Sequence, residues 1–600
     1  MTTVSSQTGS FRLVAYQGDR KTLLAFDLAQ ADAANLAGFT IQCQPPGGGP
    51  AYYVHNTLQF EHPGDHAQDA SQPPTASINA PIHKFRWVHV PGSIHQGIDP
   101  ALGDYTYTVT PRYFTNGAMT ALDPARTASV TIAVQSFAKG NLRLGFTRGY
   151  VQSQGFANHF GKDALIRPKG KTLIYDTTAT CGQNAAGQTF SFQDEYGWLG
   201  FTARQLVFEL LKDVAQTPGR RLDVFAYDFN EPDVLTQLQA FAKTGRLRVI
   251  LDNAALHHPS KPEDEAEALL NGAHAGTVIR GKFGRYAHDK VFVIYDNDTP
   301  IRVLTGSTNF SVTGLYVNSN HVLVFDDPEV AGWYAGVFQE AWTDGVSQKA
   351  FEASAWASKT YSTTNAATPP TDINFSPHTA AFATNLLGGL VARVQQEGAA
   401  ASEGSVLFAV MQLTGGSNAV YHALDNLHAR QTIFSYGISD SPAGVSLYPI
   451  GSKTGVLVTG KPGSTTLPPP FNQIANIGMG HQVHDKFVVC GFNRPDAVVY
   501  CGSSNLAEGG EQANGDNLLA IHDQDVATVF AIEALLLVDH FDFLDRYPKT
   551  GSDGKTARPV PASKQVAAAE AGWFLSTDDK WTAKYFDPTD LHSVDRQLFA

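Results

Sequence analysis

Short runs of alternating apolar and polar residues fill the first 135 positions of the chain. Gly, Pro and Asp residues separate these runs, as they do where turns join strands. The pattern predicts an all-β domain over residues 1–135, with strands in FRLVAYQ, TLLAFDL, GFTIQCQ, KFRWVHV, DYTYTVTPRYF and SVTIAVQ. Because 600 residues are too many for one core, we expect further domains.

From about residue 140 the apolar positions change to helical spacing and alternate with strand-like runs. The sequence TARQLVFELLKDVA predicts a helix over 202–215, and RLDVFAYDF predicts a strand over 221–229. A helix over 234–245 and a strand over 246–252 complete a β-α-β unit, which requires a parallel strand pair with a right-handed crossover. The order strand, helix, strand returns over 405–438.

The region after residue 140 therefore divides into two similar halves. A connector rich in Thr, Ala and Pro lies between them at 358–372. We expect an α/β (α+β) fold, with a duplicated core of two mixed or parallel sheets flanked by helices and preceded by the β-domain. The predicted halves cover 140–360 and 370–550, and a C-terminal tail over 551–600 is expected to pack on the core.

One unit of sequence occurs in both halves. Residues 286–311 read YAHDKVFVIYDNDTPIRVLTGSTNFS, and residues 482–507 read QVHDKFVVCGFNRPDAVVYCGSSNLA. At a constant offset of 196 residues, the copies share a His-x-Lys pair and a Gly-Ser-x-Asn tail. A match of this length indicates that the whole unit is duplicated. The shared residues are His288, Lys290, Ser307 and Asn309 in the first copy and His484, Lys486, Ser503 and Asn505 in the second.

Each copy predicts a hairpin that brings these residues together. The His and Lys side chains, two positions apart, project from the same side of a strand. Turn-forming residues then reverse the chain, DNDTP in one copy and FNRPD in the other. A converging imidazole, ammonium, hydroxyl and amide suit an anion with several oxygens, such as a phosphate. A single histidine here would equally fit a structural residue, but the matched pair favours a site.

The duplicated motifs resemble those of the phospholipase D superfamily, in which His-x-Lys-x4-Asp and a downstream G-[GS]-x-N occur twice. The resemblance covers roughly residues 140–543. The sequence departs from the family at the Asp, because Tyr295 and Gly491 stand in its place, and the spacing from His to Gly is longer. The tyrosyl-DNA phosphodiesterase branch likewise lacks this Asp and keeps His, Lys and Asn.

The resemblance implies a metal-independent phosphodiesterase that needs no cofactor. One neutral imidazole attacks phosphorus and forms a phosphohistidine, while the other protonates the leaving oxygen and then activates water. In the family the N-terminal histidine is usually the nucleophile, which would be His288, with His484 as acid and base; the near symmetry of the copies leaves this open. The lysines and asparagines would stabilise charge on the phosphate oxygens. We expect Ser307, Ser503 and His481 to contact the substrate.

Two more matched pairs precede the last strand of each unit. They are Asn318 with Asn514 and Asn320 with Asp516. The family often has an Asn or an acidic residue there that supports the catalytic histidine, and a polar strand start explains them equally well.

Three other sets of residues are expected to have no catalytic role. Asp289 and Asp485 alternate to the opposite face of their strands and are predicted to be structural. The acidic run from Glu263 to Glu267 predicts a solvated helix start. His257 and His258 lie in a loop after a strand, and we assign them no role.

The charge balance helps to choose among substrates. A net charge of −13 argues against a broad basic surface for duplex DNA, so no stable nucleic-acid complex is expected. We therefore expect a phospholipid substrate, hydrolysed or transferred, with peripheral membrane contact. A nuclease or another non-lipid phosphodiesterase on the same core is the alternative. A binding protein with a decayed site is a third class, which the two intact His-x-Lys pairs argue against.

Features of export and of metal binding are absent from the sequence. No apolar run reaches transmembrane length, and the N-terminus lacks a signal-peptide pattern, so we expect a cytoplasmic protein or one secreted without a signal peptide. No His/Cys cluster has zinc-ligand spacing. The cysteines are expected to be reduced, although Cys490 and Cys501 flank one hairpin and could approach each other.

The N-terminal β-domain resembles a fibronectin type III or immunoglobulin-like sandwich. Such a domain beside a catalytic core could bind a protein or carbohydrate partner, or could pack on the core as a structural part.

Overall fold

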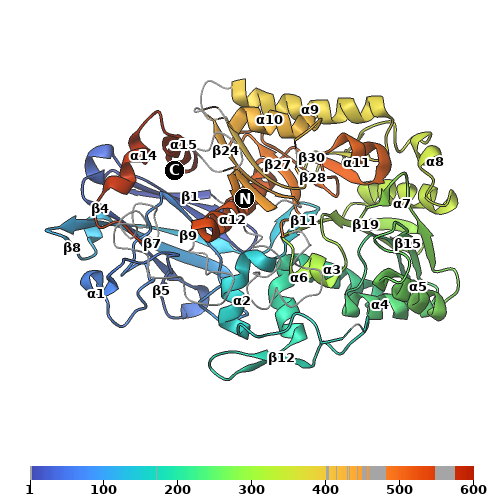
Figure 1. Ribbon diagram of the computed structural model, residues 1–600, viewed down its shortest axis with the longest axis horizontal. Helices are drawn as coiled ribbons and strands as arrows, with labels where there is room; N and C mark the ends of the chain where they lie inside the picture. Colours follow the sequence, from blue (N-terminus) through green and yellow to red (C-terminus); the bar gives the residue numbers. More distant parts are fainter. Residues whose placement is uncertain are drawn as a thin grey trace.

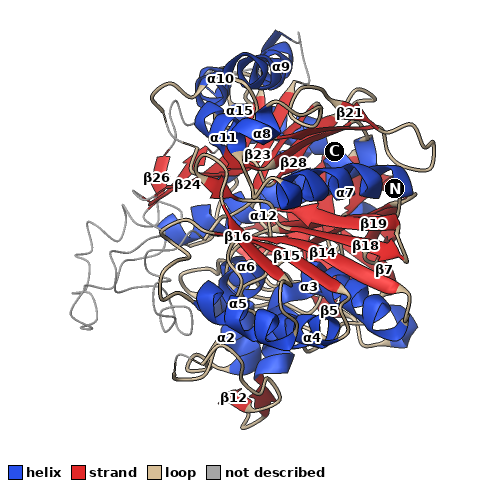
Figure 2. Ribbon diagram, turned by 90° about the vertical axis from the view of Figure 1, so that its right-hand side faces the viewer, coloured by secondary structure: helices blue, strands red, loops and turns tan. Residues whose placement is uncertain are grey.

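The structure is a computed structural model of the 600-residue chain. It describes residues 3–170, 172–399, 404–413, 415–428, 430, 433–441, 444–448, 456–458, 482–546 and 574–600. An all-β region, blue in Figure 1, lies beside a larger region in which helices and sheets form layers (Figures 1 and 2).

Two β-sheets form the N-terminal region. One has the strand order β1-β2-β3-β6, and the other has the order β5-β4-β7-β8 with β9 paired to β7. Side chains from both sheets, among them Leu24, Phe39 and Tyr107, share one buried core. The predicted β-rich region is therefore confirmed, while its fibronectin- or immunoglobulin-like identity stays a prediction. The strands are β1 (Thr3–Thr8), β2 (Phe11–Gln17), β3 (Thr22–Asp27), β4 (Leu36–Gln44), β5 (Tyr52–Tyr53), β6 (Arg86–His89), β7 (Gly103–Thr115), β8 (Ala118–Met119) and β9 (Ala128–Val134).

The first sheet of the larger region has the order β10-β11-β20-β19-β18-β14-β15-β16. Strand β14 runs parallel to β15, and β15 runs parallel to β16, whereas the other neighbours are antiparallel. The predicted parallel β-α-β unit is β14, α4 and β15. The strands are β10 (Phe137–Lys139), β11 (Leu142–Phe146), β14 (Arg220–Ala226), β15 (Leu247–Asp252), β16 (Val278–Gly281), β18 (Val291–Asp296), β19 (Thr299–Gly306) and β20 (His321–Phe325).

The second sheet repeats this order as β21-β22-β30-β28-β27-β23-β24-β25-β26. Strands β23 and β24 are parallel, as β14 and β15 are, but β25 is antiparallel to β24. The hairpin turns also match, since Asn297 and Asn493 both adopt positive φ. The strands are β21 (Tyr361–Ser362), β22 (Thr371–Phe375), β23 (Ser405–Met411), β24 (Phe434–Ser441), β25 (Gly444–Tyr448), β26 (Val456–Val458), β27 (Lys486–Cys490), β28 (Val498–Gly502) and β30 (Asn517–Ile521).

Helices cover both outer faces of the sheets and fill the space between them (Figure 2). The inner layer contains α7 and α12. The ring of Phe530 on α12 lies 5.3 Å from His321 of the first sheet and 5.0 Å from Phe487 of the second. This layering confirms the predicted duplicated α/β core. The main helices are α3 (Phe192–Gln216), α4 (Pro232–Lys243) and α5 (Pro262–Ala273) on the first sheet, α7 (Pro328–Thr343) and α12 (Gln524–Arg546) between the sheets, and α9 (Ala380–Ala399) and α10 (Ala419–His428) on the second.

Smaller elements connect these layers. They are α1 (Pro63–His66), α2 (Ser153–Phe160), α6 (Val312–Tyr316), α8 (Gln348–Glu352), α11 (Glu508–Ala513), α14 (Ala583–Phe586), α15 (Leu591–Phe599), β12 (Thr180–Gln183), β13 (Thr189–Ser191), β17 (Tyr286–Ala287) and β29 (Asn514–Gly515).

Buried ion pairs join the N-terminal region to the core and to the chain end. Arg86 of β6 lies 2.8 Å from Asp539 of α12 and 2.9 Å from Asp595 of α15. Lys21 pairs with Glu533 of α12, and both side chains are buried. The C-terminal segment 574–600 thus contacts both regions, while the earlier part of the predicted tail, 551–573, lies outside the described residues.

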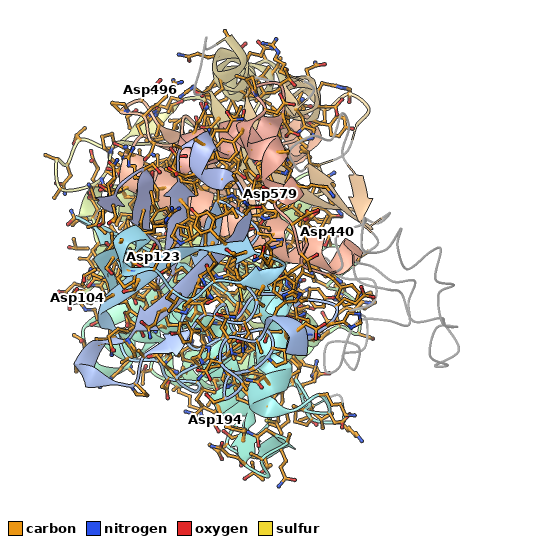
Figure 3. The ribbon with its side chains drawn as sticks, turned by 90° about the vertical axis from the view of Figure 1, so that its left-hand side faces the viewer. Asp104, Asp123, Asp194, Asp440, Asp496 and Asp579 are labelled. Carbon is orange, nitrogen blue, oxygen red and sulfur yellow. The ribbon has the colours of Figure 1, made fainter. Side chains whose placement is uncertain are left out.

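Exposed acids such as Asp104, Asp194 and Asp496 lie on different parts of the molecule rather than in one patch (Figure 3). Among the described helices, none combines the length and the apolar character needed to cross a membrane. All four cysteines are buried and free.

Candidate active site

The two copies of the repeated unit meet at the ends of their central strands. Strand β17, just before His288, pairs in parallel with β29 of the other copy. A parallel bridge joins Ser319 to Val483, the residue before His484. The backbone N–H of His288 donates to Gly515 at 2.8 Å, and that of His484 donates to Ser319 at 3.0 Å. Each histidine is therefore positioned by the backbone of the opposite half.

The side chains of the two histidines are held across the same junction. The Nδ1 atom of His288 lies 2.7 Å from Oδ1 of Asp516. The Nδ1 atom of His484 lies 2.8 Å from Oδ1 of Asn320 and 3.1 Å from the carbonyl oxygen of Ser307. A carboxylate only accepts hydrogen bonds, so His288 carries its proton on Nδ1 and presents Nε2 as its basic nitrogen. Each imidazole is therefore oriented by a residue of the other copy.

Hydroxyl groups hold the partner residues in place. The Oγ1 of Thr147 donates to the carbonyl of Asn318 at 2.6 Å and accepts from the backbone N–H of Asn320 at 3.0 Å. In the second half, the Oγ of Ser376 makes the equivalent bonds to the Asn514 carbonyl, at 2.9 Å, and to the backbone N–H of Asp516, at 3.0 Å. Neither hydroxyl was singled out from the sequence, because the two residues do not share the 196-residue offset.

The lysine ammonium groups lie beside the histidines and are buried. Each donates to the carbonyl of the histidine two residues before it. The Nζ atom of Lys290 lies 4.8 Å from the centre of the Tyr227 ring, and that of Lys486 lies 3.3 Å from Sδ of Met411. Burial lowers the pKa of Lys290 to about 8. Burial and the nearby charge of Lys290 lower the pKa of Lys486 well below its ordinary value.

Burial also sets the charge state of the first histidine. Desolvation lowers the pKa of His288 to about 4, although Asp516 opposes this shift. The charge of Lys486 contributes to the same lowering, which indicates that the two motifs share one electrostatic environment. Although burial would raise the pKa of Asp516, His288 holds it below the ordinary value. At neutral pH the site therefore contains a neutral His288 beside an ionised Asp516.

The remaining predicted residues lie around these groups. The Nδ2 atom of buried Asn309 donates to Asp228 at 2.8 Å, and Asn505 occupies the matching place in the second copy. Ser307 and Ser503 are fully buried and bond to the strand starts of β20 and β30. Their predicted contact with substrate stays a prediction. His481 lies outside the described residues.

The aspartates within the two motifs also pair across the junction. Oδ1 of Asp289 accepts from Asn517 at 2.7 Å, and Oδ1 of Asp485 lies 2.8 Å from Nδ1 of His321. Burial raises the pKa of Asp289 to about 7. Both side chains therefore link the two copies, and their predicted structural role stays a prediction.

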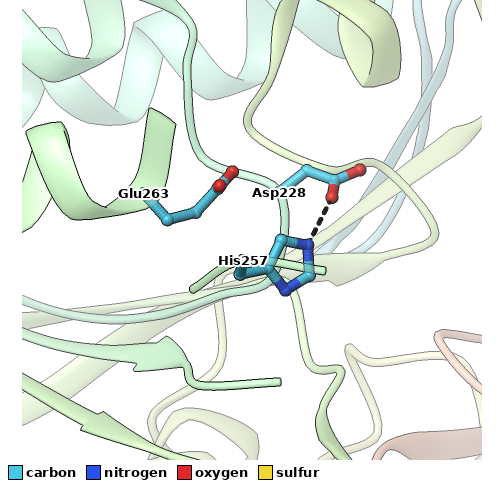
Figure 4. A group of neighbouring side chains, drawn as sticks. All are labelled: Asp228, His257 and Glu263. Carbon is cyan, nitrogen blue, oxygen red and sulfur yellow. Dashed lines mark hydrogen bonds and ion pairs between the residues drawn. The ribbon is translucent and has the colours of Figure 1, made fainter. Parts of the chain in front are cut away.

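A further group of titratable residues adjoins the site. The side chains of Asp228, His257 and Glu263 lie within 4.8 Å of one another and have the donor set of a metal site. Figure 4 shows the imidazole of His257 pointing to Asp228, with Glu263 beside them. Glu263 is buried, so the prediction of a solvated helix start was wrong for this residue, because the first turn of α5 packs against the end of β14. The only sequence signal for this group was the position of Asp228 at the end of the predicted strand 221–229 and of His257 in the loop after the next strand.

Comparison with known protein families matches one part of the chain. The family model described as the phospholipase D-like domain of cardiolipin synthase matches residues 211–342, which include His288, Lys290 and Asn309. No curated protein matches the chain in sequence.

Solved structures show distant similarity. Phosphatidylserine synthase from Haemophilus influenzae Rd KW20 is 12% identical over 57% of this chain and 85% of its own, with a TM-score of 0.38. Nuc from Salmonella typhimurium, a phospholipase D family member, is 21% identical over 23% of this chain and 86% of its own, with a TM-score of 0.19. Polyphosphate kinase from Porphyromonas gingivalis is 14% identical over 62% of this chain, with a TM-score of 0.35, and the match spans 53% of that kinase.

The matched domain lies in the first half of the duplicated core, and the second half repeats its strand order. Over residues 211–342 the match supports the resemblance to the phospholipase D superfamily that the duplicated motifs indicated.

Proposed function

We propose that the protein is a metal-independent phospholipase D-type enzyme that hydrolyses phospholipid head groups, or transfers the phosphatidyl group, through a phosphohistidine on His288. The observation that carries this proposal is the unequal support of the two histidines. His288 bonds to the carboxylate of Asp516, whereas His484 bonds to the amide of Asn320. The two imidazoles therefore differ chemically, although their motifs are alike.

A carboxylate partner suits the nucleophile. When Nε2 of His288 attacks phosphorus, the N–P bond forms, the bond from phosphorus to the leaving oxygen breaks, and the ring becomes cationic because Nδ1 keeps its proton. The negative charge of Asp516, 2.7 Å away, stabilises that cation. The lowered pKa of His288 keeps its nucleophilic form dominant at neutral pH.

An amide partner suits the acid. An imidazolium bonded to neutral Asn320 gives up its proton more readily than one bonded to a carboxylate. In the first step His484 protonates the leaving oxygen. In the second step it takes a proton from water, whose oxygen attacks phosphorus while the bond to Nε2 of His288 breaks. Transfer uses an alcohol in place of water.

The surrounding cations suit a phosphodiester anion. Lys290 and Lys486 are both buried beside the histidines, where an anionic ligand restores their favourable charged form. The amides of Asn309 and Asn505 add donors from the same two motifs. The lipid assignment is supported by the cardiolipin synthase description of the matching family model and by the net charge of −13, which disfavours duplex DNA.

An activated aryl phosphodiester with acid quenching and mass spectrometry tests the mechanism. In the wild type the added mass is expected on His288. The His288→Ala variant should lose both turnover and adduct, whereas His484→Ala should form the adduct and accumulate it, because a good leaving group needs little protonation. His258→Ala is the matched control, since this exposed side chain lies in the loop beside the site. An adduct on His484 would reverse the roles, and full activity in the double Ala variant would remove the mechanism.

A product screen tests the substrate class. Phosphatidylcholine vesicles, phosphatidylethanolamine vesicles and single-stranded DNA are incubated with the wild type and with His288→Ala. Release of choline or ethanolamine by the wild type alone is the expected result. Cleavage of DNA without release of either head group would replace the lipid assignment with the alternative, a nuclease.

A further inference from the structure

A continuous chain of hydrogen bonds runs from the end of β15 to the catalytic amide of Asn309. Oδ2 of Asp252 lies 2.8 Å from Nδ1 of His257, and Nε2 of His257 lies 2.8 Å from Oδ1 of Asp228. The other oxygen of Asp228 accepts from Nδ2 of Asn309 at 2.8 Å. Four side chains from three segments of the chain are thus linked end to end.

The geometry identifies His257 as a doubly donating imidazolium. Both ring nitrogens lie at hydrogen-bond distance from carboxylate oxygens, which only accept. Burial would lower the pKa of His257, but the bonds to Asp228 and Asp252 outweigh it and raise the pKa to about 9. The positive charge in turn neutralises part of the acidic charge that Asp228 would otherwise bring to a phosphate site.

The same cluster is a poor metal site. A metal would need Nε2 of His257, which already faces Asp228. Glu263 accepts from the backbone N–H of Phe229 at 3.0 Å, so its carboxylate is already engaged as well.

The amide of Asn309 depends on this chain for its orientation. Within the described residues, its Oδ1 atom is buried and has no hydrogen-bond partner, so the bond to Asp228 is the contact that fixes the amide. Because Asp228 only accepts, Nδ2 must lie on its side, and the second N–H of that nitrogen is left for the substrate. The strand register aligns Asp228 of the first half with Gln412 of the second half. The series of hydrogen bonds through Asp228 is therefore a feature of the first half.

Asp252 also fixes the nucleophile. Its Oδ1 accepts from the backbone N–H of Ala287, one residue before His288, at 2.6 Å. Asp440, at the end of the matching strand β24 and labelled in Figure 3, accepts from the backbone N–H of Val483, one residue before His484, at 3.2 Å. The device occurs in both halves, which indicates that strand-end carboxylates set the position of each motif.

We propose that Asp228 and His257 are positioning residues that aim the Asn309 amide at the phosphate, with Asp252 as the fixed point shared by this amide and by His288. The inference rests on the proposed phosphodiesterase function. Neither residue is required to touch the substrate, and both act through Asn309.

The proposal predicts where the kinetic loss falls. A misdirected Asn309 no longer stabilises charge on the phosphate oxygens in the transition state. The Asp228→Ala variant should therefore lower kcat by about 10²-fold with little change in KM. Asp228→Asn keeps an acceptor oxygen for the Asn309 amide and should recover part of the rate. His257→Gln, which can donate to one carboxylate only, should fall between the wild type and Asp228→Ala.

A double-mutant cycle with the activated aryl phosphodiester separates positioning from structure. Asn309→Ala alone should lower kcat by on the order of 10²–10³. If Asp228 acts through Asn309, adding Asp228→Ala to that variant causes no further loss. His258→Gln, in the same loop and with an exposed side chain, is the control and should behave as wild type. Thermal midpoints of all variants report folding independently of kcat.

Three results would overturn the inference. They are a full additional loss in the double variant, an unchanged kcat in Asp228→Ala, and inhibition of the wild type by EDTA that Asp228→Ala abolishes, which would make the cluster a metal site. Failure of the proposed function is seen separately, as activity retained by His288→Ala.

Discussion

His288 and Asp516 are 228 positions apart in the chain, yet Nδ1 of one lies 2.7 Å from Oδ1 of the other. The histidine belongs to the first copy of the repeated unit and the aspartate to the second. A single half of the core therefore contains a His-x-Lys motif without the group that orients its imidazole. The duplicated halves complete each other, and the unequal partners break the symmetry of the repeat.

The hydrogen-bond partners of the two histidines, Asp516 and Asn320, can be exchanged by mutation. Asp516→Asn removes the anion that stabilises the cationic phosphohistidine, so adduct formation should slow by about 10²-fold while the shape of the site is kept. Rapid-quench measurement of adduct on His288 checks this. Asn320→Asp is the matched control: it should strengthen the hold of His484 on its proton, and so slow reactions with poor leaving groups only. Equal effects of both changes with an activated substrate would argue against distinct roles.

The pH profile of adduct formation follows from the buried charges. His288, with its pKa lowered to about 4, is nucleophilic above that pH, so the rate should fall as the pH drops through about 4. Lys290, with its pKa lowered to about 8, is cationic below that pH, so the rate should fall as the pH rises above it.

An activated leaving group keeps the acid step out of this measurement. The descending limb of kcat/KM, which reports the free enzyme, should begin at or below about pH 8, well below the ordinary lysine pKa of about 10.4. In the pH profile of kcat, the descending limb should begin at a higher pH, because a bound anion stabilises the ammonium groups. A rate that stays flat to pH 10 would contradict this account.

Chelation should leave the chemistry intact. The proposed mechanism takes its nucleophile from His288 and its positive charge from Lys290 and Lys486, so EDTA should not change kcat by more than experimental error. Initial rates on the aryl substrate, with the chelator and after its removal with and without added divalent ions, make the comparison. A requirement for an added ion in the cleavage step would exclude the two-histidine mechanism.

Arg86 should contribute strongly to stability, because it holds two carboxylates of other regions. Its side chain is 4% exposed and pairs with Asp539 and Asp595. Arg86→Met leaves both acids without their buried cation and should cost about 3–5 kcal/mol, seen as a lower thermal midpoint. Arg126→Met, which removes an exposed arginine paired with Asp123 in the same region, is the control and should change the midpoint little.

The effect of Arg86 should also depend on pH. Although burial would raise it, Arg86 holds the pKa of Asp539 far below its ordinary value. The stabilisation from this pair is therefore present above the unfolded carboxyl pKa, about 3.9, and is lost as the pH falls toward the folded value. The difference in midpoint between wild type and Arg86→Met should shrink in acid, and a constant difference would contradict the assignment.

Much of the core was predictable because its signals are local or repeated. Strand alternation and helix spacing gave the β-region and the β-α-β unit. The constant offset between His288 and His484 revealed the duplication. Residues within one copy were predicted to meet because a hairpin joins them through short-range geometry. The pair Asn320 and Asp516 was visible as a matched position, and the sequence left its role undecided between support of a histidine and a polar strand start.

The series of hydrogen bonds from Asp252 to Asn309 could not be predicted in the same way. Asp252 and Asp440 are equivalent in the sheets but are 188 residues apart, so they do not fall on the offset that reveals the motifs. His257 stands in a loop whose sequence has no repeat. Only the order of strands in the sheet brings this loop to the end of β14, where Asp228 lies.

The sequence by itself determined the duplication and pointed to the proposed chemistry, because two copies of His, Lys and Asn recur at fixed spacing within hairpins that form locally. The tertiary structure alone decided which partner each histidine receives and which carboxylates fix the motifs. The contacts of the two histidines join residues 228 and 164 positions apart, and they exist only once the two sheets pack around α7 and α12 and place their strand ends against each other. Side-chain pairing across such a junction depends on how the two halves pack in space, and the sequence pattern of a single segment does not specify that packing.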